Sequence, residues 1–345
     1  MGRLKELDSL RGIAALAVVF YHYTTRYEEL FGHKKDSYLE FNYGDLGVNL
    51  FFIISGFVIF MTIINTNTVR DFAQKRAIRL YPAYISAVVI TFLMVRLYGL
   101  EGRGVSSFEA LFNITMLQGF VPIINHVDGA YWSLTVELTF YILIGIILYL
   151  GRIKNVFALS ILWLISSFII QVANIVSNDH IITKALVYYS IADYSHLFIA
   201  GIMFYYIKVN PHLKYYVMLI SCLIYQFAIS DILTSTITVV FFLIFYLLIK
   251  NKLTFLNFKP LTFLGTISYS LYLIHQNIGY IVIDIMENHN LINEVYLIIP
   301  VSISIVLATL ITYYIEKPTI SIFKKQMKKR KIMKLEKEEL SAKAL

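Results

Sequence analysis

The sequence has one cysteine and few charged residues, and both shortages narrow what the chain can be. With Cys222 alone it forms no internal disulfide and no cysteine-rich metal site. Charged side chains make up 15% of the 345 residues, whereas a soluble chain carries about a quarter. Hydrophobic residues reach 58%, and the mean hydropathy is +0.68. These proportions exclude an ordinary soluble domain and indicate a helical protein that crosses a membrane several times.

Common sequence signatures of metal, nucleotide and serine-hydrolase sites are also missing. The eight histidines are scattered without metal-ligand spacing, and we expect no metal site. The net charge of +8 does not indicate a nucleic-acid partner, because much of it lies in the tail after Tyr314. A basic helical tail of this kind suits the anionic inner surface of a membrane. We therefore expect contact with membrane lipid and no nucleic-acid binding.

Apolar segments of roughly 20 residues, enough to cross a bilayer, recur along the chain. They predict an all-α polytopic membrane protein with about ten transmembrane helices and no soluble domain. Residues 1–318 form the expected membrane domain, and residues 319–345 form a basic cytoplasmic tail. The expected spans are 10–28, 44–65, 82–98, 130–150, 155–176, 185–207, 213–230, 232–249, 262–284 and 293–315.

Segment 105–126 is moderately apolar, and the distribution of basic residues decides whether it spans. Cytoplasmic loops collect lysine and arginine. If the segment stays on one side, most of the basic residues, including those of the tail, share one side of the membrane. If it crosses, this asymmetry largely disappears. We therefore predict a re-entrant or interfacial segment, with both termini cytoplasmic. The opposite loops then hold Arg26, Lys34, Lys35, Arg103 and Lys184.

His22 is the first candidate catalytic residue, because an ionisable side chain at membrane depth is costly and usually functional. It lies roughly 9 Å from the outer end of its span, and Glu137, in YWSLTVELTFY, lies roughly 10 Å deep in another. A carboxylate beside an imidazole fixes the tautomer that a general base needs. The matched depth favours a His22–Glu137 catalytic pair, and the alternative is a polar pair that ties two helices together.

Three arginines indicate a site for phosphates. Arg76 and Arg79, in KRAIRLYP, share a helix face, and Arg11 lies near the same membrane surface. Guanidinium groups match phosphate oxygens, although a belt of basic residues on the cytoplasmic side is the ordinary alternative. Arg11 and His22 lie about 16 Å apart along a helix. A ligand with phosphates and a long thin arm, such as coenzyme A, would fit this spacing.

Weaker candidates lie in two other spans. Ser55 is mid-span in GVNLFFIISGFVIF, where small residues usually serve close helix packing. Tyr269 and His275 lie in ISYSLYLIHQ, and a hydrogen-bonded core histidine explains His275 equally well. We regard all three as candidate contacts to a substrate or to an oxyanion.

At these residues the chain resembles membrane-bound acyltransferase family 3, which comprises bacterial inner-membrane enzymes that modify surface polysaccharides and related molecules. The likeness covers nearly the whole chain, and six motifs occur in the family's order. In the first of them, ten residues separate an arginine from a histidine. The motifs are LDSLRGIAALAVVFYH, GVNLFFIISGFVI, KRAIRLYPAY, YWSLTVELTFY, ISYSLYLIHQ and YYIEKP.

The resemblance implies roles for the candidate residues. It implies acetyl-CoA as a donor substrate, no permanently bound cofactor, and a location in the bacterial inner membrane. Asn49 stands where the family often has an acidic residue, so we assign it no acid role. By resemblance, His22 is catalytic, Glu137 is its partner, and Arg11, Arg76 and Arg79 belong to the acyl-donor site.

The sequence therefore predicts an O-acetyltransferase acting on a bacterial surface glycan, such as an O-antigen, capsule or exopolysaccharide unit. His22 would remove a proton from the acceptor hydroxyl, and both direct transfer and an acyl-histidine intermediate remain open. The rival hypothesis is a transporter or flippase of a lipid-linked or small substrate, which the spans and buried charges suit equally well. Acylation of a different acceptor, such as peptidoglycan, a macrolide or a free amino acid, is a third.

Overall fold

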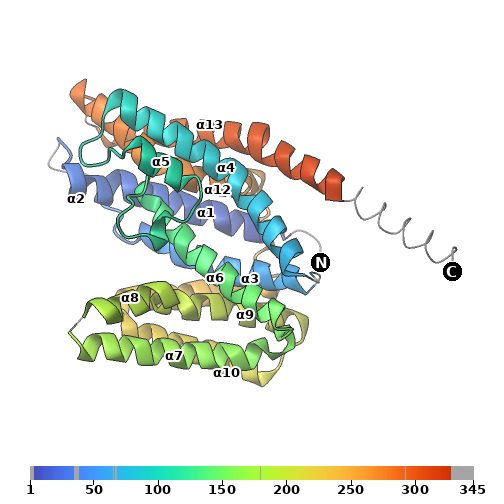
Figure 1. Ribbon diagram of the computed structural model, residues 1–345. Helices are drawn as coiled ribbons and strands as arrows, with labels where there is room; N and C mark the ends of the chain where they lie inside the picture. Colours follow the sequence, from blue (N-terminus) through green and yellow to red (C-terminus); the bar gives the residue numbers. More distant parts are fainter. Residues whose placement is uncertain are drawn as a thin grey trace.

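The computed structural model of the protein describes residues 4–34, 39–64, 66, 68–178, 180–291 and 293–327, and these form helices without any β-strand (Figure 1). Lys35 and residues 328–345 of the expected tail lie outside the described residues. The α-helices are α1 (Lys5–Tyr21), α2 (Tyr27–Phe31), α3 (Gly47–Ile63), α4 (Val69–Tyr98), α5 (Ser107–Asn113), α6 (Trp132–Tyr149), α7 (Val156–Val176), α8 (Ile181–Ser190), α9 (Ser195–Val209), α10 (Leu213–Ile229), α11 (Ile232–Ile249), α12 (Lys259–Asn288) and α13 (Ile298–Leu310).

Two π-helical segments interrupt the regular helices. The first, His22–Arg26, joins α1 to α2, and the second, Ile311–Glu316, extends α13. A π turn holds one residue more than an α turn and is frequent at functional sites. Both segments carry ionisable side chains that the sequence motifs include.

Within the described residues, six helical stretches are long and apolar enough to cross a membrane, which indicates a polytopic membrane protein. The count of about ten spans remains a prediction. Of the other four expected spans, 213–230 corresponds to α10, which has 17 residues. The six stretches are Gly44–Ile63, Val69–Tyr98, Gly129–Tyr149, Ile153–Val176, Ile232–Ile249 and Glu294–Met327.

Two of the expected spans have different bounds in the structure. The predicted span 185–207 is not one continuous helix, because the chain leaves α8 at Ile191 with a φ of 50° and enters α9 at Ser195. The predicted span 82–98 begins earlier, because α4 starts at Val69 and continues through Pro82. The first turns of α4 are charged, so a prediction based on apolar runs does not include them. Arg76 and Arg79 lie in this early part of the helix.

Segment 105–126 folds back on itself. Ser106 and Glu109 form a capping box that starts α5, a helix of 7 residues that is too short to span. The Glu109 carboxylate also accepts hydrogen bonds from the backbone and side chain of Asn125, at 3.1 and 2.7 Å. Hydrogen bonds from Ser106 and Asn125 lower the pKa of Glu109 to about 2. Because these contacts join the two ends of the segment, it returns to the level at which it began.

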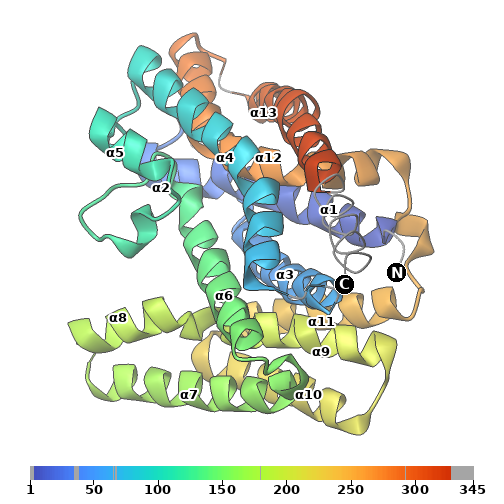
Figure 2. The ribbon, with the colours of Figure 1, turned by 45° about the vertical axis from the view of Figure 1, so that its right-hand side comes forward.

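The long helix α12 is the centre of the packing. It lies against α1, α4 and α13, while α1 also contacts α3, and α3 packs on α9. Figures 1 and 2 show α7, α8, α9 and α10 as a layer on one side of the group formed by α1, α3, α4, α6, α12 and α13. The start of α1 and the end of the C-terminal helix (the stretch Glu294–Met327) lie at the same end of the bundle.

Glycines bring α1 and α12 into close contact. A Cβ on Gly12 would lie 2.6 Å from the backbone nitrogen of Gly265, and a Cβ on Gly265 would collide with the backbone oxygen of Asp8. Small residues at a crossing let two membrane helices approach until their backbones touch. This approach sets the distance between the later turns of α1 and α12, where His22 and His275 lie.

We expect Gly265→Ala to destabilise the protein, because the added methyl group meets backbone atoms that cannot rotate away. Overpacking of this kind costs about 1–3 kcal/mol. Gly145→Ala is the matched control, since a Cβ on Gly145 meets nothing within 4 Å. Thermal unfolding of both variants in detergent measures the difference, and equal melting temperatures would contradict the close contact.

Candidate functional site

Three neighbouring cavities follow one another through the bundle. We call them the basic cavity, which Lys75 lines and which has a volume of about 800 Å³, the central cavity, which Arg11 lines and which has about 120 Å³, and the histidine cavity, which His22 lines and which has about 720 Å³. Val58, Arg76 and Arg79 line both the basic and the central cavity. Val48 and Tyr272 line both the central and the histidine cavity. The shared walls place the central cavity between the other two.

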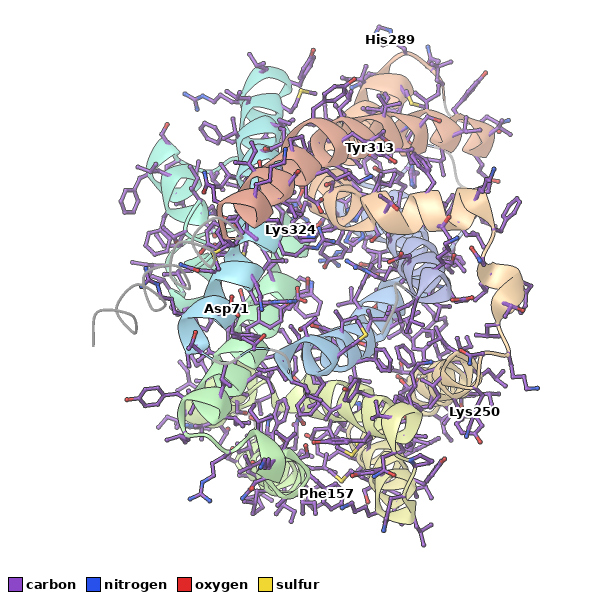
Figure 3. All side chains as sticks on the ribbon, turned by 90° about the vertical axis from the view of Figure 1, so that its right-hand side faces the viewer. Asp71, Phe157, Lys250, His289, Tyr313 and Lys324 are labelled. Atoms are coloured by element: carbon purple, nitrogen blue, oxygen red, sulfur yellow. The ribbon has the colours of Figure 1, made fainter. Side chains whose placement is uncertain are left out.

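The basic cavity opens at the end of the bundle where α4 begins and the C-terminal helix ends. Asp71 and Lys324 line it, and both are labelled in Figure 3, which views the molecule from that end. Lys75 also lines this cavity and forms an ion pair with Asp71 at 2.7 Å. The cavity gives a charged ligand a route from the surface to Arg76 and Arg79.

The three arginines predicted from the sequence all line the central cavity. The Nε atoms of Arg11 and Arg76 are buried without a hydrogen-bond partner. Arg76 makes one long hydrogen bond, from Nη2 to the Thr62 hydroxyl at 3.4 Å, and lies 5.9 Å from the rings of Phe72 and Tyr141. Buried donors without acceptors cost free energy, so these two guanidinium groups are suited to an anionic ligand.

Arg79 differs from the other two arginines because it has a carboxylate partner. Its Nη1 donates to Glu316, at the end of the second π segment, and its guanidinium lies 5.4 Å from the ring of Tyr269. Ser270 donates to the other oxygen of Glu316 at 3.4 Å. Glu316 is the glutamate of the YYIEKP motif, to which the sequence assigned no role, because no local signal in the sequence indicates its pairing with Arg79.

His22 begins the first π segment and contacts His275 rather than a carboxylate. The Nδ1 of His22 lies 2.8 Å from the Val18 oxygen and 3.2 Å from Nε2 of His275. The Nδ1 of His275 lies 2.9 Å from the Tyr272 oxygen. Because two carbonyl oxygens can only accept, this network assigns the proton of each ring to Nδ1. The Nε2 lone pair of His22 is then available for a proton.

Several contacts fix the part of α12 that carries His275. The Tyr23 hydroxyl lies 2.8 Å from the His275 oxygen and 2.7 Å from the Ser304 hydroxyl. Gly279 leaves room for the Tyr23 ring, which a Cβ there would meet. The buried carboxylate of Asp128 accepts from the backbone nitrogen of Asn277 at 3.0 Å. The imidazole of His275 is fully buried between these contacts, so it can orient His22.

The direct His22–Glu137 contact predicted from matched depth is not formed. The Glu137 carboxylate accepts hydrogen bonds from Ser55, at 2.9 Å, and from the hydroxyl of Tyr141. It lines the central cavity, whereas His22 lines the histidine cavity. The depth of a residue along its helix does not determine the face of the helix on which its side chain lies. His22 and Glu137 lie at matched depth but face different cavities.

The structure also places the two hydroxyls that the sequence analysis considered as oxyanion donors. Ser55 and Tyr269 both line the central cavity. The Ser55 hydroxyl donates to Glu137, and the Tyr269 hydroxyl donates to the Leu80 oxygen at 3.1 Å. Both protons therefore already have acceptors in the wall of the central cavity.

The histidine cavity is lined by polar and aromatic side chains. Hydrogen bonds from Thr234 hold the pKa of Asp231 below its usual range, so this carboxylate is charged at neutral pH. Among the residues that the structure describes, no group of three or more histidine, cysteine or acidic side chains is placed to hold a metal ion. The cavity walls include His22, Asn49, Arg103, Trp132, Asp193 and Asp231.

Comparisons with known proteins show which family the chain is similar to. A family model described as "Acyltransferase domain" matches residues 4–316. "Nodulation protein 10" of Rhizobium leguminosarum bv. viciae is 26% identical over 170 residues, which cover 44% of this chain and 46% of that protein. "O-acetyl transferase" of Shigella phage Sf6 is 28% identical over 169 residues, 43% of this chain and 46% of that protein. The matched part is thus less than half the length of either relative, and no solved structure matches.

We expect Glu316→Ala to destabilise the protein, because it leaves the Arg79 guanidinium, which is 30% exposed, without a carboxylate partner that is only 5% exposed. Removing one partner of a buried pair costs about 3–5 kcal/mol. Asp71→Ala is the matched control, since its ion pair with Lys75 is exposed and such pairs contribute about 0–1 kcal/mol. Thermal unfolding in detergent compares the two, and an equal loss would contradict a buried Arg79–Glu316 pair.

Proposed function

This chain belongs to the acyltransferase family, and we propose that it is a membrane O-acyltransferase. In this proposal it moves an acetyl group from cytoplasmic acetyl-CoA to a hydroxyl of a bacterial surface glycan. The observation that carries the proposal is a series of cavities, with the buried and unpartnered Nε atoms of Arg11 and Arg76 in its middle and the free Nε2 of His22 at one end. The relative named O-acetyl transferase supports oxygen as the acceptor atom.

The donor enters through the basic cavity in this proposal. Its phosphates bind Arg11 and Arg76, whose buried donors have no acceptor from the protein, and Arg79 adds a third positive charge. The pantetheine arm occupies the central cavity, whose small volume of about 120 Å³ suits a thin chain. About 16 Å of helix separates Arg11 from His22, so the thioester reaches the boundary with the histidine cavity.

The acceptor occupies the histidine cavity, where His22 acts as the general base. Its Nε2 takes the proton of the acceptor hydroxyl while the hydroxyl oxygen attacks the thioester carbon. The new carbon–oxygen bond replaces the carbon–sulfur bond, and His22 returns the proton to the departing thiolate of coenzyme A. The Val18 oxygen and Nε2 of His275 both accept from Nδ1 and together hold the tautomer and the ring orientation, which is the role expected of Glu137 from the sequence. Glu137 instead orients Ser55 and Tyr141 beside the donor.

The location in the proposal is the bacterial inner membrane with both termini cytoplasmic. The start of α1, the end of the C-terminal helix and the mouth of the basic cavity lie at one end of the bundle. That end would face the cytoplasm, where acetyl-CoA is available. The acceptor cavity would then open toward the opposite side, where surface glycan units are modified.

A transporter remains the second candidate, because cavities toward both ends of a bundle also suit alternating access. The purified protein distinguishes the two. Acetyl-CoA consumption that depends on a glycan acceptor supports the enzyme, whereas translocation without any covalent change supports the transporter.

We expect His22→Ala to lose glycan acetylation, by about 10²-fold or more, because it removes the general base. His275→Asn is expected to keep part of the activity, since an amide oxygen can still accept from Nδ1 of His22, whereas His275→Leu should lose most of it. Acetyl transfer is measured by mass spectrometry of the acceptor, and membrane insertion is checked for each variant. Full activity of the His22→Ala protein would remove His22 from the mechanism.

We expect Arg11→Ala and Arg76→Ala to raise the KM for acetyl-CoA much more than the KM for acetyl-pantetheine, which lacks the nucleotide phosphates. A hydrogen bond to a charged group contributes about 1.5–3 kcal/mol, so each KM should rise about tenfold or more. Lys208→Ala is the control, because that side chain bonds the Ile249 oxygen away from the three cavities. Equal KM changes for both donors would contradict phosphate binding.

A further inference from the structure

Among the polar side chains of the histidine cavity that the chemistry above leaves unused, two lie close together. Arg103, from the loop after α4, and Gln276, from α12, line it together with His22. A volume of about 720 Å³ lies within the usual range of small-molecule sites. We propose that the acceptor bound here carries an anionic group, a carboxylate or a phosphate, which Arg103 binds while Gln276 binds a neighbouring hydroxyl. This inference rests on the proposed function, because it names the substrate class of the same site.

The side-chain amide oxygen of Gln276 has no hydrogen-bond donor. The side chain is 3% exposed, and its Oε1 is buried without any hydrogen-bond partner. Its Nε2 makes a long contact with the Tyr280 hydroxyl, at 3.4 Å. A buried oxygen without a donor costs free energy in the empty protein. A sugar hydroxyl in the cavity supplies the missing donor.

Arg103 has unused donors in the same cavity. Within the described part of the chain its guanidinium forms neither a hydrogen bond nor an ion pair, whereas Arg26, which also lines the cavity, pairs with Glu29 at 2.6 Å. A guanidinium group presents a planar fork that matches two oxygens of a carboxylate or a phosphate. Of these two arginines, Arg103 is therefore the one suited to an external anion.

Gly129 shows that the two side chains converge. A Cβ built on Gly129 would lie 2.9 and 3.0 Å from the amide nitrogen and oxygen of Gln276, and 3.2 Å from Nη1 of Arg103. Both side-chain ends thus lie over the same glycine, at the start of the turn that leads into α6. A ligand that reaches one of them also meets the other.

The ordinary explanation of Arg103 is compensation of the buried Asp128 carboxylate, on which it acts electrostatically. The two oxygens of Asp128 accept instead from the backbone nitrogens of Ala130 and Asn277, at 2.9 and 3.0 Å. Electrostatic compensation of Asp128 without a hydrogen bond needs only a positive charge on residue 103. Bidentate binding of a carboxylate or a phosphate needs the planar fork of the guanidinium group. Arg103→Lys keeps the charge and removes the fork, so it separates the two explanations.

Tryptophan fluorescence can test the proposal on the full-length protein in detergent. Of the two tryptophans in the chain, Trp132 lines the histidine cavity, and Trp163 lies outside its lining. In a Trp163→Phe background we titrate glucuronate, glucose 6-phosphate and glucose. We expect at least one of the acidic sugars to bind about tenfold more tightly than glucose, as a charge-assisted contact provides. If glucuronate binds more tightly than glucose 6-phosphate, the anionic group of the acceptor is a carboxylate. If glucose 6-phosphate binds more tightly, that group is a phosphate.

Three variants complete the experiment. Arg103→Lys should remove most of the preference for the acidic sugar, and Gly129→Ala should weaken binding of all three sugars by displacing Gln276 and Arg103. Arg70→Lys is the control, because Arg70 is an exposed residue outside the three cavities. Equal affinities for acidic and neutral sugars, no signal from any sugar, or an unchanged preference in Arg103→Lys would each overturn the proposal.

Acetyl-CoA consumption by the same preparations separates this proposal from the proposed function. Acyl transfer without a preference for acidic sugars leaves the enzyme and rejects the anionic subsite. Binding of acidic sugars without any acyl transfer keeps the subsite and rejects the enzyme.

Discussion

The contact between α1 and α12 is the constraint on which the rest of the site depends. Glycines at Gly12 and Gly265 bring the two backbones together at one end, and the imidazoles of His22 and His275 meet further along, 3.2 Å apart. The histidine cavity and the central cavity are placed relative to this pair, because the walls of both include residues of the first helical segment and of α12. The contact between His22 and His275 is specific, because among the described residues neither ring contacts any other imidazole.

Much of the site was predictable from the sequence. Long apolar runs predicted an all-helical membrane protein, and charge distribution predicted that segment 105–126 does not cross, in agreement with its folded-back contacts. The arginines were proposed as a phosphate site from their spacing and depth, and the structure brings all three to one cavity, while their role stays a prediction. These inferences rest on the length of apolar segments, the charge of loops and helical spacing, which are read directly from the chain.

The partner of His22 was not predictable in the same way. Two side chains at equal depth can face different directions, and Glu137 faces the central cavity while His275 reaches His22. The same limit hid Glu316, whose contact with Arg79 joins residues 237 positions apart. Helix rotation and long-range pairing arise from packing, and no single segment encodes them. Ile191 is a further case, since a β-branched residue with a positive φ gives no sequence signal for the break before α9.

Because the three cavities lie in series, donor and acceptor can approach from opposite ends of the bundle, which matters for the permeability of the membrane. In the proposed reaction, coenzyme A is released through the basic cavity and the acetylated sugar is released from the histidine cavity. Neither molecule therefore has to cross the whole bundle. Only the acetyl group passes from one molecule to the other, at the boundary between the central cavity and the histidine cavity. The central cavity, of about 120 Å³ and lined by three guanidinium groups, would also disfavour the passage of cations between the two larger cavities.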